Sequence, residues 1–370
     1  MPAIHQNGFG QQGLRQRVMD HSREALCSEA SKRLEPRRSG LPPIAAKTAR
    51  GPRVTRMAKY KIGIVGFGRI AREQHAPAIA ASPDFELQAV SNPTPGAPPA
   101  GVPTFATMAH MLQNVPRLDA VALCTPPGPR RLLAVQCVAA GKHVLLEKPP
   151  AATVAEVNDL ASRANAAGKV IFAAYHSQHN QAVKSAAQIL AGKAIRALAV
   201  TWKEDIRQWH PGQDWILEAG GFGIFDTGIN ALSILTRMLP QPVFISSANL
   251  WFPSNRQAPI AADLTLTTGT AATERLTANF DWRQSGGPPT WEIHIDTVDG
   301  IKLKVGDGGS RLEVEGQRPF LGPADEYANV YRVFAALLAA GKSQIDSAPF
   351  QLVADSFMVG RRTQVEAFEF

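Results

Sequence analysis

Short apolar segments alternate with segments of helical periodicity over residues 60 to about 177. The apolar segments lie at 61–65, 86–91, 119–124, 143–147 and 169–175, and the helical segments lie near 70–81, 106–113, 129–140 and 153–167. Thr153 and Glu156 form a capping-box pattern at the start of the last helix, and Gly168 is placed to end it. This alternation predicts βα units that build a parallel sheet.

The segment 92–103 interrupts the alternation, because it contains five prolines and two glycines. Proline lacks the N–H group that a helix interior needs, so we expect a loop there. The parallel sheet should therefore lose or shorten one of its crossover helices.

From about residue 194 the pattern changes to alternating apolar and polar positions. In the segment 275–282 the residues Leu276, Ala278, Phe280 and Trp282 share an apolar face, and the residues between them are polar. The same alternation runs through 291–296, and similar runs lie at 194–206, 242–252, 262–269 and 301–305. These runs predict an open, mainly antiparallel sheet.

Three helical patterns, at 224–239, 326–341 and 349–366, are expected to cover one face of this second sheet. The other face stays uncovered, and an uncovered sheet commonly pairs with a second copy. We therefore hypothesise a homodimer that forms through the open sheet.

A glycine motif follows the first apolar segment directly. It reads Gly66-Phe67-Gly68-Arg69-Ile70-Ala71. Gly66 permits a tight turn, Gly68 lets the backbone approach a pyrophosphate, and Ala71 lets the next helix pack on the strand. The amide groups at a helix N-terminus bind anions. Within βα units the motif predicts a dinucleotide site, and a strand-turn-helix with a purely structural role is the alternative.

The composition divides the chain further. Residues 1–57 hold eleven Lys and Arg against four Asp and Glu and have no clear hydrophobic period. We expect a disordered basic extension there, with three alternatives: a segment upstream of a natural start at Met57, a flexible basic arm, or a transit peptide. For the rest, the patterns predict an α/β N-terminal Rossmann domain over 58–177 and an α+β substrate-binding and dimerisation domain over 178–370.

The charge excludes some partners. Subtracting residues 1–57 from the totals of 39 basic and 31 acidic residues leaves 28 and 27, a net of about +1. Nucleic-acid binding needs a clustered basic face, so we expect none. No apolar run reaches the roughly 20 residues that span a bilayer, so we expect no membrane association. The cysteines at 27, 124 and 137 lack disulfide or zinc spacing, which favours a cytoplasmic protein with no metal site.

Charged residues lie where a parallel sheet binds ligands. Glu147 and Lys148 end one apolar segment, and Pro149 keeps Lys148 extended, so its ammonium should project beyond the sheet edge. Thr125 and Pro126 take the same place after a neighbouring segment. The alternative is a surface lysine without a role.

Asp226 and Asn230 begin a helix after the glycine-rich segment 220–223. Residues four apart on a helix face the same way, so both side chains should point into one pocket. The helix dipole stabilises a carboxylate at this end, and stabilisation of the helix start is the alternative role of Asp226.

The segment 202–215 concentrates three tryptophans, His210 and several carboxylates, Glu204 among them. Aromatic faces beside hydrogen-bonding groups suit a sugar ring, although ordinary packing also uses tryptophan. The sequence contains no His-x-x-x-His, Cys-x-x-Cys or Gly-x-Ser-x-Gly motif, so metal-dependent and serine-nucleophile chemistry find no support.

Four motifs in order carry a family resemblance: Gly-Phe-Gly-Arg-Ile-Ala at 66–71, Thr-Pro-Pro at 125–127, Glu-Lys-Pro at 147–149 and Asp-x-Gly-x-Asn at 226–230. Over nearly everything after residue 57 the chain resembles the glucose-fructose oxidoreductase / inositol dehydrogenase / rhizopine catabolism family. The segments 202–213 and 223–234 are similar to those of bacterial L-arabinose / D-galactose 1-dehydrogenases.

The resemblance implies NAD(P)-dependent oxidation of an aldopyranose, D-galactose or L-arabinose, at C1 to the lactone. It implies that the reacting hydroxyl is lined by Lys148, Asp226 and Asn230, that Glu204 and His210 hold other hydroxyls, and that Trp209 and Trp282 flank the ring. The expected cofactor-binding residues are Gly66, Phe67, Gly68, Arg69, Ile70, Ala71, Ser91, Asn92, Thr125, Pro126, Glu147 and Lys148.

Two assignments depend on departures from the family pattern. Many relatives carry His where this chain has Asn230, and an amide cannot titrate, so Asn230 cannot be the base. We expect Asp226 to be the base and Lys148 to polarise the hydroxyl. The alternative is that Lys148 itself is the base. NAD enzymes usually place an acid on the ribose about 20 residues beyond the glycine loop, but Ser91 and Asn92 stand there. We therefore expect NAD and NADP both to be used, with the preference undecided and Arg69 as a possible 2′-phosphate clamp.

Two other functions stay open. One is a dehydrogenase for another polyol, such as an inositol or a dihydrodiol. The other is a regulator of the same fold that senses a dinucleotide without turnover, although Lys148 and Asp226 favour catalysis.

Overall fold

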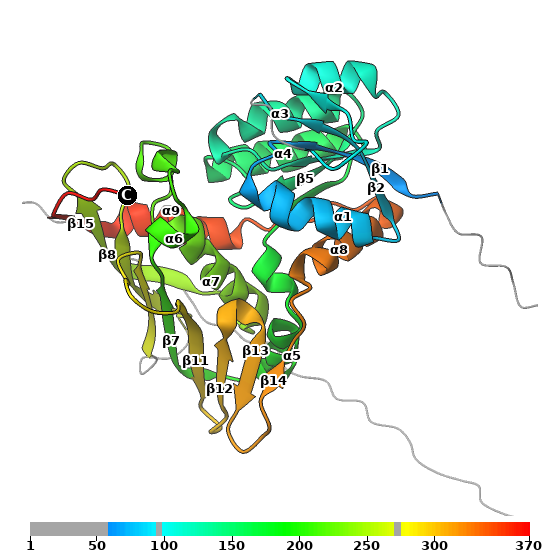
Figure 1. Ribbon diagram of the computed structural model, residues 1–370. Helices are drawn as coiled ribbons and strands as arrows, with labels where there is room; N and C mark the ends of the chain where they lie inside the picture. The colour runs from blue at the N-terminus through cyan, green and yellow to red at the C-terminus, as the bar shows by residue number, and fades with distance from the viewer. Residues whose placement is uncertain (1–57, 94–97, 270–274) are drawn as a thin grey trace, which may run out of the picture. The chain divides into compact units, whose positions relative to one another are not determined.

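The computed structural model describes residues 58–93, 98–269 and 275–370 (Figure 1). The predicted basic extension, residues 1–57, lies outside the described residues, as do 94–97 within the proline-rich segment.

The first sheet is parallel throughout. Its strands are β1 (Tyr60–Val65), β2 (Phe85–Ser91), β3 (Thr104–Phe105), β4 (Ala120–Leu123), β5 (His143–Glu147) and β6 (Ile171–Ala174), in the order β3-β2-β1-β4-β5-β6. The helical elements between them are η1 (Ala71–His75), α1 (Ala76–Ala81), α2 (Met108–Asn114), α3 (Pro127–Ala139) and α4 (Val154–Ala166). The predicted Rossmann domain is confirmed, including the capping box of Thr153 and Glu156 at the start of α4.

The predicted loop at 92–103 contains no helix in its described residues. The sequence pattern missed β3, which has two residues and pairs with the end of β2. A strand this short gives no apolar run for the pattern to detect.

The second sheet is open and mainly antiparallel, as predicted. Its strands are β7 (Ile195–Lys203), β8 (Phe244–Pro253), β9 (Ala261–Thr267), β10 (Arg275–Asp281), β11 (Thr290–Thr297), β12 (Lys302–Gly306), β13 (Arg311–Val314), β14 (Phe320–Leu321) and β15 (Gly360–Val365). They follow the order β14-β13-β12-β11-β7-β10-β9-β8-β15. Two pairs, β7 with β10 and β8 with β15, are parallel.

Helices cover one face of this second sheet. These are α5 (Gln181–Leu190), α7 (Phe225–Met238) and α9 (Ala348–Val359), which share one hydrophobic core with the sheet. Leu276, Ala278 and Phe280 are buried on that face, and Phe225 of α7 packs edge-on against Phe280 at 6.0 Å between ring centroids. The alternation in β10 is therefore confirmed.

The prediction that 326–341 covers the second sheet is wrong. This segment forms α8 (Glu326–Ala340), which shares a core with the first sheet. Phe334 stacks on Phe85 of β2 and on Phe172 of β6, with ring centroids 5.6 and 6.0 Å apart. The apolar face of a helix carries no information about which of two sheets it covers, so the pattern could not decide.

The prediction of one helix over 349–366 is also wrong. α9 ends at Val359, and residues 360–365 form β15 instead, paired with β8. A Cβ on Gly360 would lie 2.4 Å from the carbonyl oxygen of Ser356 and 2.7 Å from Leu250. The glycine thus permits the close approach at which the chain leaves the helix for the edge of the sheet.

In the described part of the chain, none of the helices has the length and apolar character needed to cross a membrane. The boundary predicted at residue 177 stays a prediction, since α8 lies within 178–370 in sequence but packs on the first sheet.

Candidate active site

The residues predicted to bind a dinucleotide lie at the carboxyl ends of four strands of the first sheet. Gly66–Ala71 joins β1 to η1, Ser91 and Asn92 end β2, Thr125 and Pro126 join β4 to α3, and Glu147 and Lys148 end β5. The strand order changes direction between β1 and β4, and doubly wound sheets bind dinucleotides at that point.

Gly66 makes the turn after β1 possible. Its φ is +86°, which residues with a Cβ rarely adopt. A Cβ here would also lie 2.9 Å from backbone atoms of Cys124 and Thr125, where β4 ends. The Gly66 N–H donates to the carbonyl oxygen of Ser91, at the end of β2, at 2.8 Å. A larger residue would therefore push the ends of β1 and β4 apart.

The turn leaves polar groups for an anionic ligand. A Cβ on Gly68 would meet no heavy atom within 4 Å beyond its chain neighbours, so the backbone is open there. The Phe67 N–H donates to Asn92 Oδ1 at 3.1 Å, which ties the glycine turn to the end of β2. Thr125 Oγ1 is buried and has no hydrogen-bond partner among the described residues. An open backbone at Gly68 and an unsatisfied hydroxyl at Thr125, which follows the strand next to β1, fit a dinucleotide phosphate.

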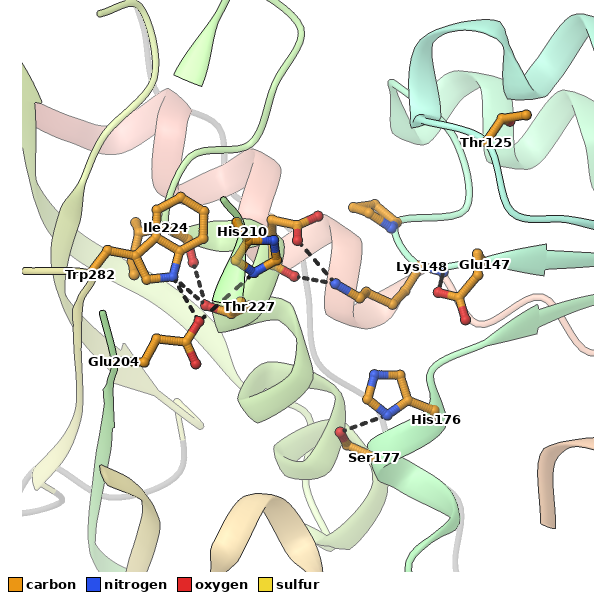
Figure 2. Close-up of polar contacts among 12 residues, drawn as sticks. Thr125, Glu147, Lys148, His176, Ser177, Glu204, His210, Ile224, Thr227 and Trp282 are labelled. Atoms are coloured by element: carbon orange, nitrogen blue, oxygen red, sulfur yellow. Dashed lines mark hydrogen bonds and ion pairs between the residues drawn. The ribbon is translucent and has the colours of Figure 1, made fainter. Parts of the chain in front are cut away.

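Lys148 reaches from the end of β5 to the first turn of α7 (Figure 2). Its Nζ donates to the carbonyl oxygen of Asp226 at 2.7 Å and lies 3.2 Å from Asp226 Oδ2. The two side chains are 13% and 8% exposed. Limited access to water strengthens an ion pair, so this contact holds the two groups together.

Glu147 is buried directly beneath Lys148. Its Oε2 accepts from the Lys148 backbone N–H at 2.8 Å, and its Oε1 accepts from Tyr327 at 2.7 Å and pairs with His75 Nε2 at 3.0 Å. Burial alone would raise the pKa of the Glu147 carboxyl, but the hydrogen bond and charge of His75 lower it to about 2. Glu147 is therefore an ionised anchor for the backbone that carries Lys148.

A buried guanidinium supports the same strand end. Arg130 of α3 donates to the carbonyl oxygens of Glu147, Pro149 and Thr125, so it joins the ends of β5 and β4. Burial lowers the pKa of Arg130 to about 10, which leaves it charged at neutral pH. The peptide between Lys148 and Pro149 is cis.

Glu204 lies at the end of β7 in a cage of indoles. Its Oε1 accepts from Trp282 Nε1 at 3.0 Å and its Oε2 from Trp291 Nε1 at 2.8 Å. Trp282 also donates to Thr227 Oγ1 at 2.9 Å (Figure 2). Burial raises the pKa of the Glu204 carboxyl to about 7, although the indole hydrogen bonds lower it. The carboxyl can therefore gain or lose a proton near neutral pH.

Trp209 and His210 stand beside this carboxyl. His210 Nε2 lies 4.0 Å from Glu204 Oε1, and burial lowers the pKa of the imidazole, so a neutral ring is favoured there. The ring of Trp209 lies 5.3 Å from that of Trp291, and its Nε1 is buried with no hydrogen-bond partner among the described residues. Arg69 of the glycine turn donates to the Trp209 carbonyl oxygen at 3.1 Å.

Asn230 and Trp282 complete the predicted sugar-binding residues. Asn230 follows Asp226 by one turn of α7, as the spacing predicted, and its Oδ1 is buried with no hydrogen-bond partner in the described chain, so it can accept from a hydroxyl. Trp282 is 0% exposed and lies behind Glu204 and His210. Its contact with a sugar ring stays a prediction, and its observed role is to hold the Glu204 carboxyl.

Sequence reasoning missed four residues that shape the site: His75, Arg130, Trp291 and Tyr327. Their partners are Glu147 or Glu204, which lie up to 180 positions away in the sequence. It also missed His176, whose ring stacks on Tyr327 and pairs with Glu326 at 3.1 Å. Burial works to lower the pKa of His176, but the charge of Glu326 raises it. Of these residues, the sequence pattern gave a signal for Trp291, because the alternation in β11 indicated that its side chain faces inward.

Comparisons with known proteins agree with this geometry. The model of the oxidoreductase family with an NAD-binding Rossmann fold matches residues 60–175. The chain is 42% identical over 312 residues to the galactose 1-dehydrogenase of Pseudomonas fluorescens, an alignment that covers 84% of this chain and 99% of that one. A solved D-galactose-1-dehydrogenase from Rhizobium etli is 46% identical, with a TM-score of 0.78 over 85% of this chain and 99% of that one.

A more distant solved structure shows the fold alone. A 3-ketoreductase from Actinomadura kijaniata, in complex with NADP, is 19% identical with a TM-score of 0.69, covering 83% of this chain and all of the other.

We expect Glu204 to make the free energy of unfolding fall as pH rises. Because its pKa is about 7 in the folded chain against an ordinary 4.5, the folded state holds a proton that the unfolded state releases in this window. The stabilisation is complete below pH 4.5 and lost above 7. The wild-type free energy of unfolding, minus that of Glu204→Gln, should decrease by on the order of 2–3 kcal/mol across the window.

Urea denaturation at several pH values measures this difference. Glu86→Gln is the matched control, because Glu86 is exposed on β2 and the substitution removes a carboxylate outside the Glu204 cage. A difference that does not change with pH for Glu204→Gln would contradict the raised pKa.

Proposed function

The chain belongs to the oxidoreductase family with an NAD-binding Rossmann fold, and we propose that it oxidises an aldopyranose, D-galactose or L-arabinose, at C1 to the lactone. The observation that carries the proposal is the contact between the Lys148 ammonium and Asp226, beside the glycine turn and the Glu204 cage. The 42% sequence identity with galactose 1-dehydrogenase, over 99% of that protein's length, supports a sugar as the substrate.

The cofactor would lie along the strand ends from the glycine turn to Lys148. A bound NAD⁺ or NADP⁺ would accept the hydride that leaves C1 of the sugar. Gly66 and Gly68 would admit the pyrophosphate, and Ser91 and Asn92 would meet the adenosine ribose. Neither residue carries a charge to repel a 2′-phosphate, so we expect both cofactors to be used.

Side chains of this chain would remove the proton from the sugar hydroxyl. The Asp226 carboxylate would take it, while the Lys148 ammonium, 3.2 Å from Asp226 Oδ2, donates a hydrogen bond to the same hydroxyl and favours the developing carbonyl. Asn230 lies one turn away and orients the hydroxyl without titrating. The C–O bond order rises as the C1–H and O–H bonds break, which gives the lactone.

The remaining hydroxyls would bind to Glu204, Trp209 and His210. D-Galactose and L-arabinose share configuration at C2, C3 and C4, so one set of partners can hold both. Glu204 accepts and His210 donates or accepts, and the indole of Trp209 offers an apolar face and an N–H without a partner among the described residues. These groups suit a ring with a polar rim.

We expect a panel of about ten aldoses, with each cofactor, to give the largest kcat/KM for D-galactose or L-arabinose. Formation of NADH or NADPH at 340 nm follows the reaction. Turnover of an inositol or a dihydrodiol in place of aldoses would favour a polyol dehydrogenase. Tight dinucleotide binding without turnover of any substrate would favour a sensor.

We expect Asp226→Ala to lower kcat by on the order of 10²–10⁴-fold, because the hydroxyl loses its base, while the dinucleotide Kd changes little. Steady-state kinetics and dinucleotide titration measure the two effects. Retention of most of the turnover would reject Asp226 as the base.

Lys148 is the rival base, and two variants separate its roles. Lys148→Arg keeps a positive charge but cannot give up a proton at neutral pH, whereas Lys148→Met removes both capacities. If Lys148 polarises the hydroxyl, the arginine variant should keep more kcat than the methionine variant. Equal loss in both would favour Lys148 as the base.

We also propose a cytoplasmic homodimer that forms through the uncovered face of the second sheet. Asn279 lies on that face and bonds to Asp263 of the neighbouring strand β9, while Thr277 beside it is exposed. An uncovered sheet face of this kind commonly pairs with a second copy. Light scattering should give the mass of a dimer, and a monomer at micromolar concentration would reject the proposal.

A further inference from the structure

The residues Trp209 and His210 lie in the middle of a segment whose two ends are anchored in the core by Ile206, Ile216 and Leu217. We call residues 205–217 the sugar loop; it contains α6 (Ile206–Trp209) and η3 (Asp214–Leu217). Near its start, the Ile206 N–H donates to the Trp282 carbonyl oxygen at 3.2 Å. Its middle, from Pro211 to Gly212, is exposed. Residues 207–215, between the buried ends, are all partly or fully exposed, so contacts from outside the loop help to fix their geometry.

The last residues of the chain contact the start of the sugar loop. The Arg207 guanidinium lies over the ring of Phe368, 4.5 Å from its centroid, and donates to the Glu369 carbonyl oxygen at 2.9 Å. Phe368 is 7% exposed. Arg207 is on α6, two residues before Trp209, so the contact fixes the outer side of the helix that presents Trp209.

The same residues contact the end of the sugar loop through Arg256. Its Nη1 pairs with Asp214 Oδ1 at 2.9 Å, its Nε donates to the Phe368 carbonyl oxygen at 3.2 Å, and its Nη2 lies 3.5 Å from Glu369 Oε2. The Arg256 side chain is 11% exposed while Asp214 and Glu369 are 60% and 78% exposed, so solvent screens the ion pairs, and the hydrogen bond to the Phe368 carbonyl oxygen is the sheltered contact.

Asn255 fixes the position of Phe368 itself. Its Nδ2 donates to the Phe368 carbonyl oxygen at 3.2 Å, and its Oδ1 accepts from the Phe368 N–H at 2.9 Å. Two reciprocal bonds hold one residue in one orientation. The C-terminal residues are therefore seated on 255–256 and contact the sugar loop near both of its ends.

We propose that Phe368 and Glu369 form a clip that positions the sugar loop for substrate binding. The clip holds α6 through Arg207 and η3 through Arg256, and it contacts none of Lys148, Asp226 and the glycine turn. Holding the loop in its binding geometry removes the ordering cost that the sugar would otherwise meet. The inference rests on the proposed function, in which Trp209 and His210 bind the sugar.

We expect Phe368→Ala to raise the KM for the sugar about tenfold, with kcat and the dinucleotide Kd changed by less than about twofold. Arg207→Gln, which removes the cation over Phe368 at a half-exposed position, should act in the same direction. Arg362→Ala is the matched control, because Arg362 of β15 lies over the ring of Phe252 of β8 in the same kind of contact, and neither residue belongs to the sugar loop or the clip. It should leave the KM unchanged.

Hydrogen exchange gives a readout that does not depend on activity. The amides of residues 206–217 should exchange faster in Phe368→Ala and Arg207→Gln than in the wild type and in Arg362→Ala. Unchanged exchange in both loop variants, or a lower melting temperature with an unchanged sugar KM, would overturn the clip. If the wild type oxidises no sugar, the proposed function fails, and the exchange measurement still decides whether the clip orders the loop.

Discussion

A buried carboxylate at the end of β5 is the constraint on which the rest of the site depends. Removing an ionised carboxylate from water costs several kcal/mol unless its oxygens are fully paired. Glu147 meets that condition through His75 from η1, Tyr327 from α8 and the Lys148 backbone N–H. Three separate segments must therefore converge before this charge can be buried, and their convergence fixes the position of the Lys148 backbone.

The position of Lys148 brings the two sheets together at the site. Lys148 follows a strand of the first sheet and Asp226 lies on the helix that covers the second, and each would lose its ion-pair partner without the other. Glu204 shows a contrasting solution, because its neighbours are indole N–H groups and a neutral histidine is favoured beside it. Its pKa rises to about 7 where that of Glu147 falls to about 2. Two buried carboxyls thus differ in charge state because of the partners the fold gives them.

The sequence indicated what local pattern and spacing can indicate. Alternation located most strands of both sheets, and the glycine motif located the turn that Gly66 makes against the end of β4. Motifs also named Lys148 and Asp226, which the structure brings into contact. Pattern could not assign α8 to the first sheet, because an apolar helix face fits either core. It could not find Tyr327 or Trp291, because their importance comes from carboxylates that approach them after folding. The helix predicted through residue 366 failed at Gly360, where edge pairing outweighed helical periodicity.

The place of α8 has a consequence for synthesis on the ribosome. The core of the first sheet includes Phe334, which is made more than 150 residues after β6 is complete. Until then the faces of Phe85 and Phe172 lack their stacking partner, and Glu147 lacks Tyr327. During synthesis the core of the first sheet therefore stays incomplete until nearly the whole chain has left the ribosome. A fragment that stops at residue 177 would lack α8, so its first sheet could not complete its hydrophobic core. The two halves of this chain are therefore not independent folding units.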